Sequence, residues 1–235
     1  MKPLLVVAHV DDPDLTVLGD VVRDHGVPIR IVRPFRGDVL PAPDEAAAVI
    51  CLGGKESADD PHDYLLRERD FLRTAAATDV PTLGICLGSQ LLALALGGTA
   101  VRGSDRAEVG FVDVTACGAG LDHPVDFTGT RFSFHWDTFQ LPPDVTVLAR
   151  SRDFVQAFAF RSAIGVQYHP ESSVDGIAGL MAGEPDKVRA AGADPDEIRY
   201  KAPEFADPSR DHLADLVEHL LAPALCPSPG AGHEH

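Results

Sequence analysis

The stretch PTLGICLGSQLLALALGG, residues 81–98, passes from an apolar strand pattern into a helical pattern, with a cysteine at the junction. Gly84 and Gly88 lie two positions on either side of Cys86. Small flanking residues permit the strained strand-to-helix turn that exposes a nucleophile, and G-x-C-x-G is the cysteine form of that motif. The following helix would direct its amino end, including the Leu87 N–H, toward the sulfur and favour the thiolate. The alternative is a buried structural cysteine, but glycines at this spacing beside a strand end favour a nucleophile.

Strand and helix patterns alternate on either side of this stretch. Short apolar runs predict buried strands, and apolar residues at helical spacing predict the helices between them. The expected strands are residues 4–10, 27–34, 46–54 and 80–85, and the expected helices are residues 14–25, 61–78 and 87–96. This order predicts an α/β fold with a mainly parallel central sheet and helices on both faces. The Gly53–Gly54 pair and Cys86 both fall at carboxyl ends of strands, where such folds carry their chemistry.

In the second half of the chain, the sequence pattern changes from alternating strands and helices to successive strands. Five β-rich segments, residues 108–116, 131–136, 145–151, 154–160 and 163–170, predict an antiparallel extension of the sheet. Helical patterns return afterwards, interrupted by prolines. We therefore expect a single domain over residues 1–222, of which residues 172–222 form a helical C-terminal extension. Residues 223–235, rich in proline and glycine, are expected to be a disordered tail.

A second candidate motif, GVQYHPE, occupies residues 165–171. Pro170 blocks helix formation and holds His169 and Glu171 in an extended arrangement at the end of a strand. A cysteine nucleophile needs a general base, and a carboxylate that orients its imidazole. H-P-E alone could equally be a turn, and His135 is a rival base. Two strand-end motifs in the order Cys, His, Glu favour His169.

Composition excludes several classes of function. The 235 residues carry a formal net charge of −16, which disfavours nucleic acid and anionic membranes as partners. The four cysteines form no CxxC pair, so neither a zinc ribbon nor a thioredoxin-like site is expected. The sequence shows no signal peptide and no apolar run of membrane-spanning length. We expect a cytoplasmic protein with free thiols.

Together with VICLGG at residues 49–54, the two motifs resemble the class I (triad-type) glutamine amidotransferases, especially the stand-alone, GMP-synthase-like members. The likeness covers roughly residues 4–171 and extends to HWDTFQLPPDVTVLARS. It implies a flavodoxin-like fold. It also implies a nucleophile, a base and an orienting carboxylate, an oxyanion hole of two N–H groups, and contacts to the substrate. Carried over position by position, these are Cys86, His169 and Glu171; Gly54 and Leu87; and Gly53, Gln90, His135, Trp136 and Asp137.

The resemblance implies hydrolysis of L-glutamine to glutamate and ammonia with no metal or organic cofactor. Only about sixty residues follow Glu171, too few for a synthetase domain, and no P-loop is present. The ammonia is therefore expected to pass to a separate acceptor-activating synthetase. Two alternatives stay open: a γ-glutamyl amide or peptide hydrolase of the same fold, and a non-catalytic regulatory homologue. Lys55 replaces the proline that usually follows the glycine pair, which leaves the choice of substrate open.

Other candidate residues have plainer interpretations. His9 follows a strand and, with no partner nearby in the sequence, is interpreted as a loop or partly buried histidine. Cys51 lies in an apolar strand and is expected in the core. Asp14 is expected to cap the helix that follows it. The terminal HEH is expected to belong to the disordered tail rather than to a metal site.

Overall fold

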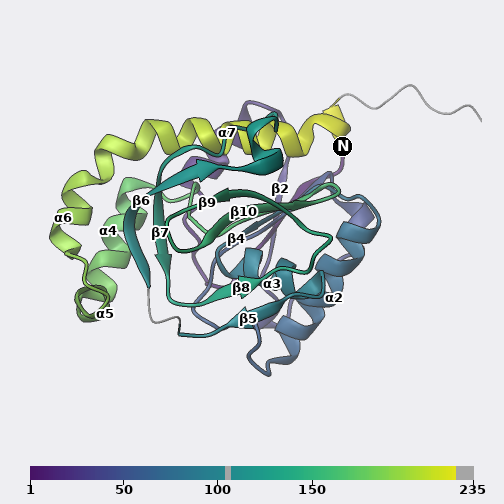
Figure 1. Ribbon diagram of the computed structural model, residues 1–235. Coiled ribbons are helices and arrows are strands. Elements are labelled where there is room, and N and C mark those ends of the chain that lie inside the picture. Colours follow the sequence, from purple (N-terminus) through teal and green to yellow (C-terminus); the bar gives the residue numbers. More distant parts are fainter. Residues whose placement is uncertain (104–106, 226–235) are drawn as a thin grey trace, which may run out of the picture.

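The protein is described by a computed structural model over residues 1–103 and 107–225 (Figure 1). Its centre is a nine-stranded sheet with the order β2-β1-β3-β4-β11-β10-β9-β6-β7. The first five strands in this order run parallel, and the last four extend the sheet in antiparallel fashion. The strands are β1 (Leu4–Val7), β2 (Ile29–Val32), β3 (Ala48–Cys51), β4 (Thr82–Ile85), β6 (Glu108–Ala116), β7 (Gly129–His135), β9 (Thr146–Arg150), β10 (Val155–Phe160) and β11 (Ala163–Val166).

Two pairs of helices cover the parallel half of the sheet. Helices α1 (Thr16–Arg23) and α7 (Ala206–Leu225) pack on one face, and α2 (Asp63–Ala77) and α3 (Leu87–Ala95) pack on the other. Strands β1, β3 and β4 are buried along their whole length, and the alternate side chains of β1 and β3 enter both of these cores. This burial explains the continuous apolar runs in the sequence.

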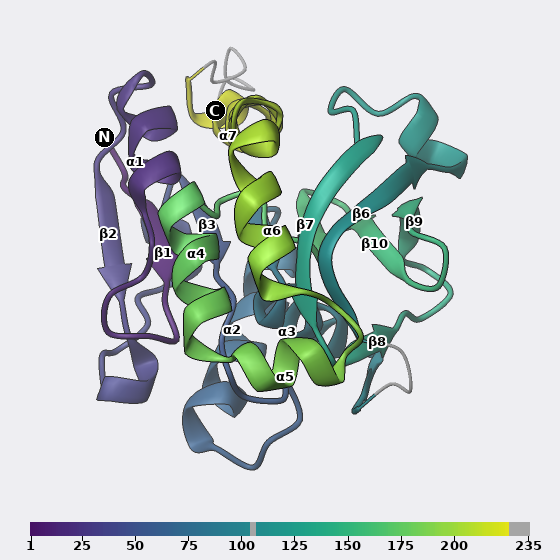
Figure 2. The ribbon, with the colours of Figure 1, turned by 90° about the vertical axis from the view of Figure 1, so that its left-hand side faces the viewer.

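A third apolar cluster forms beside the antiparallel half of the sheet. Helices α4 (Val174–Gly183), α5 (Pro185–Ala190) and α6 (Pro195–Lys201) pack there against side chains of β6 and β7. Figure 2 shows these helices on the viewer's side of the molecule, beside β7, and Figure 1 shows α7 running on from α6 across the sheet. Of the helices in the described part of the chain, none is long and apolar enough to cross a membrane.

The predicted α/β fold, with its parallel core and antiparallel extension, is confirmed, and one strand changes its assignment. The segment 163–170 was expected in the antiparallel part, but β11 pairs in parallel with β4, through Gly165 opposite Gly84. Two short strands, β5 (Thr99–Val101) and β8 (Thr138–Gln140), form a separate two-stranded sheet that the sequence did not predict. Helix α7 continues to Leu225, past the expected domain end at residue 222; the rest of the expected tail, with Cys226 and the HEH segment, lies outside the described residues.

Candidate active site

Cys86 occupies a strained turn between β4 and α3. Its backbone has φ 51° and ψ −110°, a conformation that non-glycine residues rarely adopt and that clusters at functional sites. The strain is held by neighbouring hydrogen bonds: the Cys86 N–H donates to Val166 O at 2.9 Å, and the Gly88 N–H donates to Leu52 O at 3.1 Å. Leu87 is the first residue of α3, so its N–H has no acceptor within the helix. The turn therefore presents a cysteine above the amino end of a helix.

The two glycines flanking Cys86 are required by close backbone packing. A Cβ at Gly84 would lie 2.6 Å from the Gly88 carbonyl oxygen, and one at Gly88 would lie 2.0 Å from the Cys51 carbonyl oxygen. Real Cβ atoms do not approach a backbone oxygen so closely, so β3, β4 and the start of α3 meet only because both positions lack a side chain. The glycine spacing in the sequence reflects this junction.

His169 and Glu171 follow β11, the neighbour of β4 in the sheet. The His169 Nδ1 lies 2.8 Å from Glu171 Oε1, and the His169 N–H donates to Phe132 O at 2.8 Å. Burial lowers the pKa of His169, but the charge of Glu171 and the interactions with the Cys86 side chain outweigh it and hold this pKa well above its usual value. The His169 Nε2 is buried, and the Cys86 side chain interacts with the same imidazole.

The loop after β3 brings the glycine pair to the same place. A Cβ at Gly53 would lie 3.0 Å from His169 Cε1 and 3.5 Å from Cys86 Cβ. A Cβ at Gly54 would lie 2.6 Å from Leu87 Cδ2. The structure thus brings together the predicted nucleophile, base, carboxylate and oxyanion donors, from three separate segments of the chain.

The residues predicted to contact the substrate differ in the hydrogen bonds that they form. Gln90 is buried on α3, and its Nε2 donates to the Asp137 carbonyl oxygen at 3.0 Å. The Asp137 carboxylate accepts hydrogen bonds from Ser57 Oγ and, at 2.8 Å, from Gly103 N–H. His135 is buried, with Nε2 3.3 Å from Glu108 Oε2, so its ring has a partner away from the cysteine. The hydrogen bond from Ser57 to Asp137 could not be predicted from the sequence, because the two residues are 80 positions apart.

A cavity of about 690 Å³ opens above these residues. It is lined by both rims of the site: the strand ends with Cys86 and His169, and the helical extension with Leu180 and Lys187. The Lys187 ammonium lies 4.0 Å from the centroid of the Trp136 ring, which is close enough for a cation–π interaction. Lys55, the residue that replaces the usual proline, is exposed on the cavity wall.

A model of the family "Glutamine amidotransferase class-I" matches residues 20–176, which include the cysteine turn and the H-P-E segment. The chain belongs to the class I glutamine amidotransferases. The glutamine amidotransferase-like protein YfeJ of Salmonella typhimurium is 34% identical over 173 residues, which cover 68% of this chain and 71% of that protein. The crystal structure of a glutamine amidotransferase from Methylobacillus flagellatus covers all of both chains with a TM-score of 0.86 and 26% identity.

Two curated relatives have more specific names. A γ-glutamyl-L-1-hydroxyisopropylamide hydrolase of a Pseudomonas species is 39% identical over 131 residues, which cover 49% of this amidotransferase chain and 44% of that protein. A glutamine-hydrolysing GMP synthase of Xylella fastidiosa is 32% identical over 136 residues, which cover 54% of this chain and 25% of the synthase. The chain therefore spans less than half the length of either relative.

Proposed function

We propose that this class I glutamine amidotransferase hydrolyses the side-chain amide of glutamine with Cys86 as nucleophile. The thiolate adds to the amide carbon, and the Gly54 and Leu87 N–H groups bind the oxyanion that forms. His169 then protonates the leaving nitrogen, so that ammonia departs and a γ-glutamyl thioester remains. Water, deprotonated by His169, adds to the thioester and releases glutamate and the thiolate.

The observation that carries this proposal is the meeting of two strand ends. The strained Cys86 turn after β4 and the His169–Glu171 pair after β11 lie side by side because these strands are direct neighbours in the sheet. Glu171 holds the imidazole by its Nδ1, which leaves Nε2 for proton transfer. Each oxyanion donor is expected to contribute about 3 kcal/mol to the transition state.

The raised pKa of His169 supports its pairing with a thiolate. An imidazolium that stays protonated at neutral pH stabilises the sulfur anion and can donate a proton to the leaving nitrogen. We propose that the ammonia is used by a separate synthetase that activates the acceptor. The GMP synthase relative motivates this part, because its name joins glutamine hydrolysis to a synthetic step.

A second candidate function is hydrolysis of a γ-glutamyl amide other than glutamine. It is favoured by the Pseudomonas relative, whose name states such a substrate, and by a cavity whose far wall is built by α4 and α5. The same thiolate and imidazole would serve, with an amine leaving in place of ammonia. Turnover of glutamine compared with a series of γ-glutamyl alkylamides separates the two functions.

Substitution of the nucleophile tests both candidates. We expect Cys86→Ala to abolish release of ammonia or amine, because the thiol that forms the thioester in this proposal is removed, while the fold is retained. The measurements are product release and the mass of the acyl-enzyme trapped by acid quench. Cys117→Ala is the matched control, since Cys117 is a partly exposed free thiol on another part of the chain. Retained turnover in Cys86→Ala, or an adduct on Cys117, would remove Cys86 from the mechanism.

A further inference from the structure

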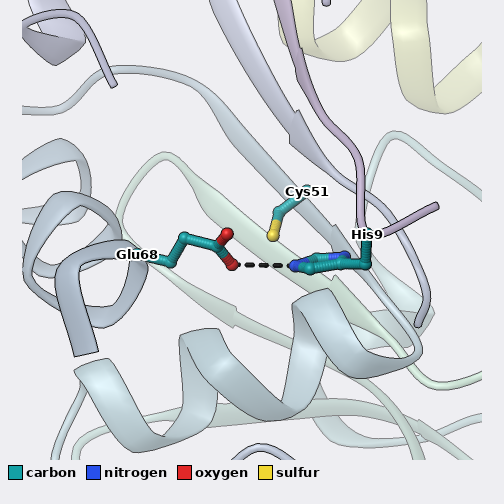
Figure 3. Close-up of side chains that lie close together, drawn as sticks. All are labelled: His9, Cys51 and Glu68. Carbon is teal, nitrogen blue, oxygen red and sulfur yellow. Dashed lines mark hydrogen bonds and ion pairs between the residues drawn. The ribbon is translucent and has the colours of Figure 1, made fainter. Parts of the chain in front are cut away.

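A buried charged pair lies directly beneath the glycine loop. His9, which follows β1, and Glu68, on α2, have side chains that are 0% and 1% exposed, and their His Nε2 and Glu Oε2 atoms lie 2.8 Å apart. The His9 Nδ1 lies 3.2 Å from the Gly53 carbonyl oxygen. Figure 3 shows the His9 ring edge-on to the Glu68 carboxylate, with the Cys51 sulfur beside them. His9 lies in the loop after β1, as the sequence interpretation expected, but it is buried and has a partner, Glu68, which that interpretation did not foresee.

The partners of His9 determine where its protons are. A carbonyl oxygen can only accept, so Nδ1 carries a hydrogen and donates to Gly53. The contact between Nε2 and Glu68 requires one further proton shared by the two groups. Burial lowers the pKa of His9, but the hydrogen bond and the charge of Glu68 outweigh it and raise this pKa above its usual value. The imidazolium form thus donates from both ring nitrogens.

The Gly53 carbonyl and the Gly54 N–H belong to one peptide unit. No cis peptide bond is present among the described residues, and in a trans peptide the C=O and N–H point in opposite directions. A hydrogen bond that holds the Gly53 carbonyl toward His9 therefore turns the Gly54 N–H away from His9. A Cβ at Gly54 would lie 2.8 Å from His9 Cβ and 2.6 Å from Leu87 Cδ2, so Gly54 is enclosed between the two.

We infer that the His9–Glu68 pair is a positioning device for the oxyanion hole: Glu68 fixes the His9 ring, and His9 Nδ1–H fixes the peptide that presents the Gly54 N–H. This inference rests on the proposed function, because it assigns the pair a part in the same reaction. Glycines on both sides of this peptide leave it free to rotate, so an external anchor is needed to keep the donor aimed. His9 is thus a positioning residue, which acts on the reaction through the Gly53–Gly54 peptide.

A metal site is the rival explanation of the same cluster. One ligand atom each from His9, Cys51 and Glu68 lies within 4.8 Å of the others. Both ring nitrogens of His9 already have oxygen partners, however, so neither lone pair is directed at a common centre with the sulfur. Burial and the charge of Glu68 raise the pKa of the Cys51 thiol well above its usual value, which opposes the thiolate that a metal requires.

Two substitutions of His9 separate positioning from packing. In His9→Asn, the side-chain amide can take the place of Nδ1 and donate to Gly53, whereas Glu68 loses its partner. In His9→Gln, the amide reaches the place of Nε2 and keeps Glu68, whereas Gly53 loses its donor. We expect His9→Gln to lower kcat about 10- to 100-fold with KM within about threefold. We expect His9→Asn to retain most of the activity although it is the less stable variant.

Alkylation of Cys86 by iodoacetamide is the internal control. Displacement of iodide at a saturated carbon forms no oxyanion, so its rate reports only the thiolate and its accessibility. We expect this rate to stay within about threefold of the wild type in His9→Gln, while amide hydrolysis falls. Equal losses of both rates, or a His9→Asn enzyme weaker than His9→Gln, would overturn the inference in favour of a structural role.

Two further measurements keep the inference distinct from the proposed function. Nitrogen-15 NMR of His9 in the wild type should show Nδ1 protonated from pH 6 to pH 9, and an unprotonated Nδ1 would overturn the inference whether or not the variants fold. Stoichiometric metal in the purified protein, lost in Cys51→Ala, would also overturn it. A wild type that hydrolyses no γ-glutamyl amide would instead refute the proposed function, and full activity in His9→Gln would refute only the positioning role.

Discussion

At the scale of single residues, Gly53 shows how little room the site leaves. Its missing side chain faces both the imidazole of His169 and the Cβ of Cys86, at the distances of an overlapping or touching methyl group. We expect Gly53→Ala to lower kcat at least about 10-fold, because the methyl group must displace His169 from the sulfur. The free energy of unfolding should change by less than about 1 kcal/mol, because the methyl group enters an open cavity rim rather than the core.

Steady-state kinetics and urea denaturation of the same preparation measure the two effects of Gly53→Ala. Gly19→Ala is the matched control: a Cβ there meets no atom within 4 Å, and Gly19 lies inside α1, where alanine should stabilise the helix. A fully active Gly53→Ala enzyme would show that the His169 ring has more freedom than its contacts indicate.

The sequence predicted the members of the site whose neighbours in the chain constrain the backbone. Cys86 was recognisable because close packing requires glycines around it, and His169 and Glu171 because they share one short motif. The partner of His9 was not recognisable, because Glu68 lies 59 positions away on an otherwise ordinary amphipathic helix. Side-chain pairs between distant segments leave no local pattern.

At the scale of elements, Asp14 joins the loop before α1 to the start of α4. Its Oδ1 accepts from the Thr16 N–H at 3.1 Å, but the N-cap residue of α1 is Leu15, so Asp14 lies one position before the cap it was predicted to form. Its Oδ2 also accepts from the N–H of Ser173 at 3.0 Å and from its hydroxyl, and Ser173 is the N-cap residue of α4. Asp14 therefore anchors the helix that forms one wall of the substrate cavity.

We expect Asp14→Ala to lower the free energy of unfolding by about 1–2 kcal/mol at pH 7, because several donors lose one acceptor. Burial raises the pKa of Asp14, but the Ser173 and Thr16 hydrogen bonds outweigh it and hold this pKa below 3.8. A depressed carboxyl pKa stabilises the fold above the ordinary value and ceases to do so as the pH falls through the folded-state value. The difference from the wild type should therefore vanish at strongly acidic pH.

Urea denaturation at pH 7 and at about pH 3 measures the Asp14→Ala difference, with Asp12→Ala, an exposed carboxylate two positions earlier, as control. A difference that persists unchanged in acid would show that the Asp14 contacts do not depend on its charge.

Among the elements themselves, the sequence predicted best those buried on both faces. Strands β1 and β3 are continuous apolar runs, and β4 lies in an apolar segment that proline precedes and glycine interrupts. Strands β5 and β8 were not predicted, because three residues each are too few to show the alternation of apolar and polar side chains that marks a strand. The parallel pairing of β11 was not predicted because its sequence neighbour β10 indicated an antiparallel hairpin, whereas its second partner, β4, lies far away in the sequence.

At the scale of the whole molecule, α7 covers one face of the sheet and itself carries a buried histidine, His212. The His212 Nε2 lies 2.7 Å from the Tyr168 hydroxyl, one residue before His169. Burial, together with the nearby Arg131 charge, lowers the pKa of His212 from 6.5 to about 3, in spite of the opposing charge of Asp126. The folded state therefore holds this histidine neutral, whereas the unfolded chain takes up a proton below pH 6.5.

This difference makes the fold sensitive to acid. Between pH 6.5 and pH 3 the buried imidazole should cost the folded state about 1.4 kcal/mol for each unit of pH, since only the unfolded state gains the proton. We expect His212→Gln to lower stability at pH 7 but to flatten the decline in unfolding free energy between pH 6.5 and pH 4. Denaturant titrations across this range measure both slopes, and parallel slopes would contradict the assignment.

The neighbouring positions of β4 and β11 in the sheet also govern when the protein can become reactive during its synthesis. A ribosome produces Cys86 long before it produces His169, because the chain first completes the antiparallel strands and only then returns to the middle of the sheet. The emerging polypeptide thus carries a thiol without the imidazole that we assign to it. Hydrolysis must await insertion of the last strand, so the order of translation itself keeps an unfinished chain from consuming substrate.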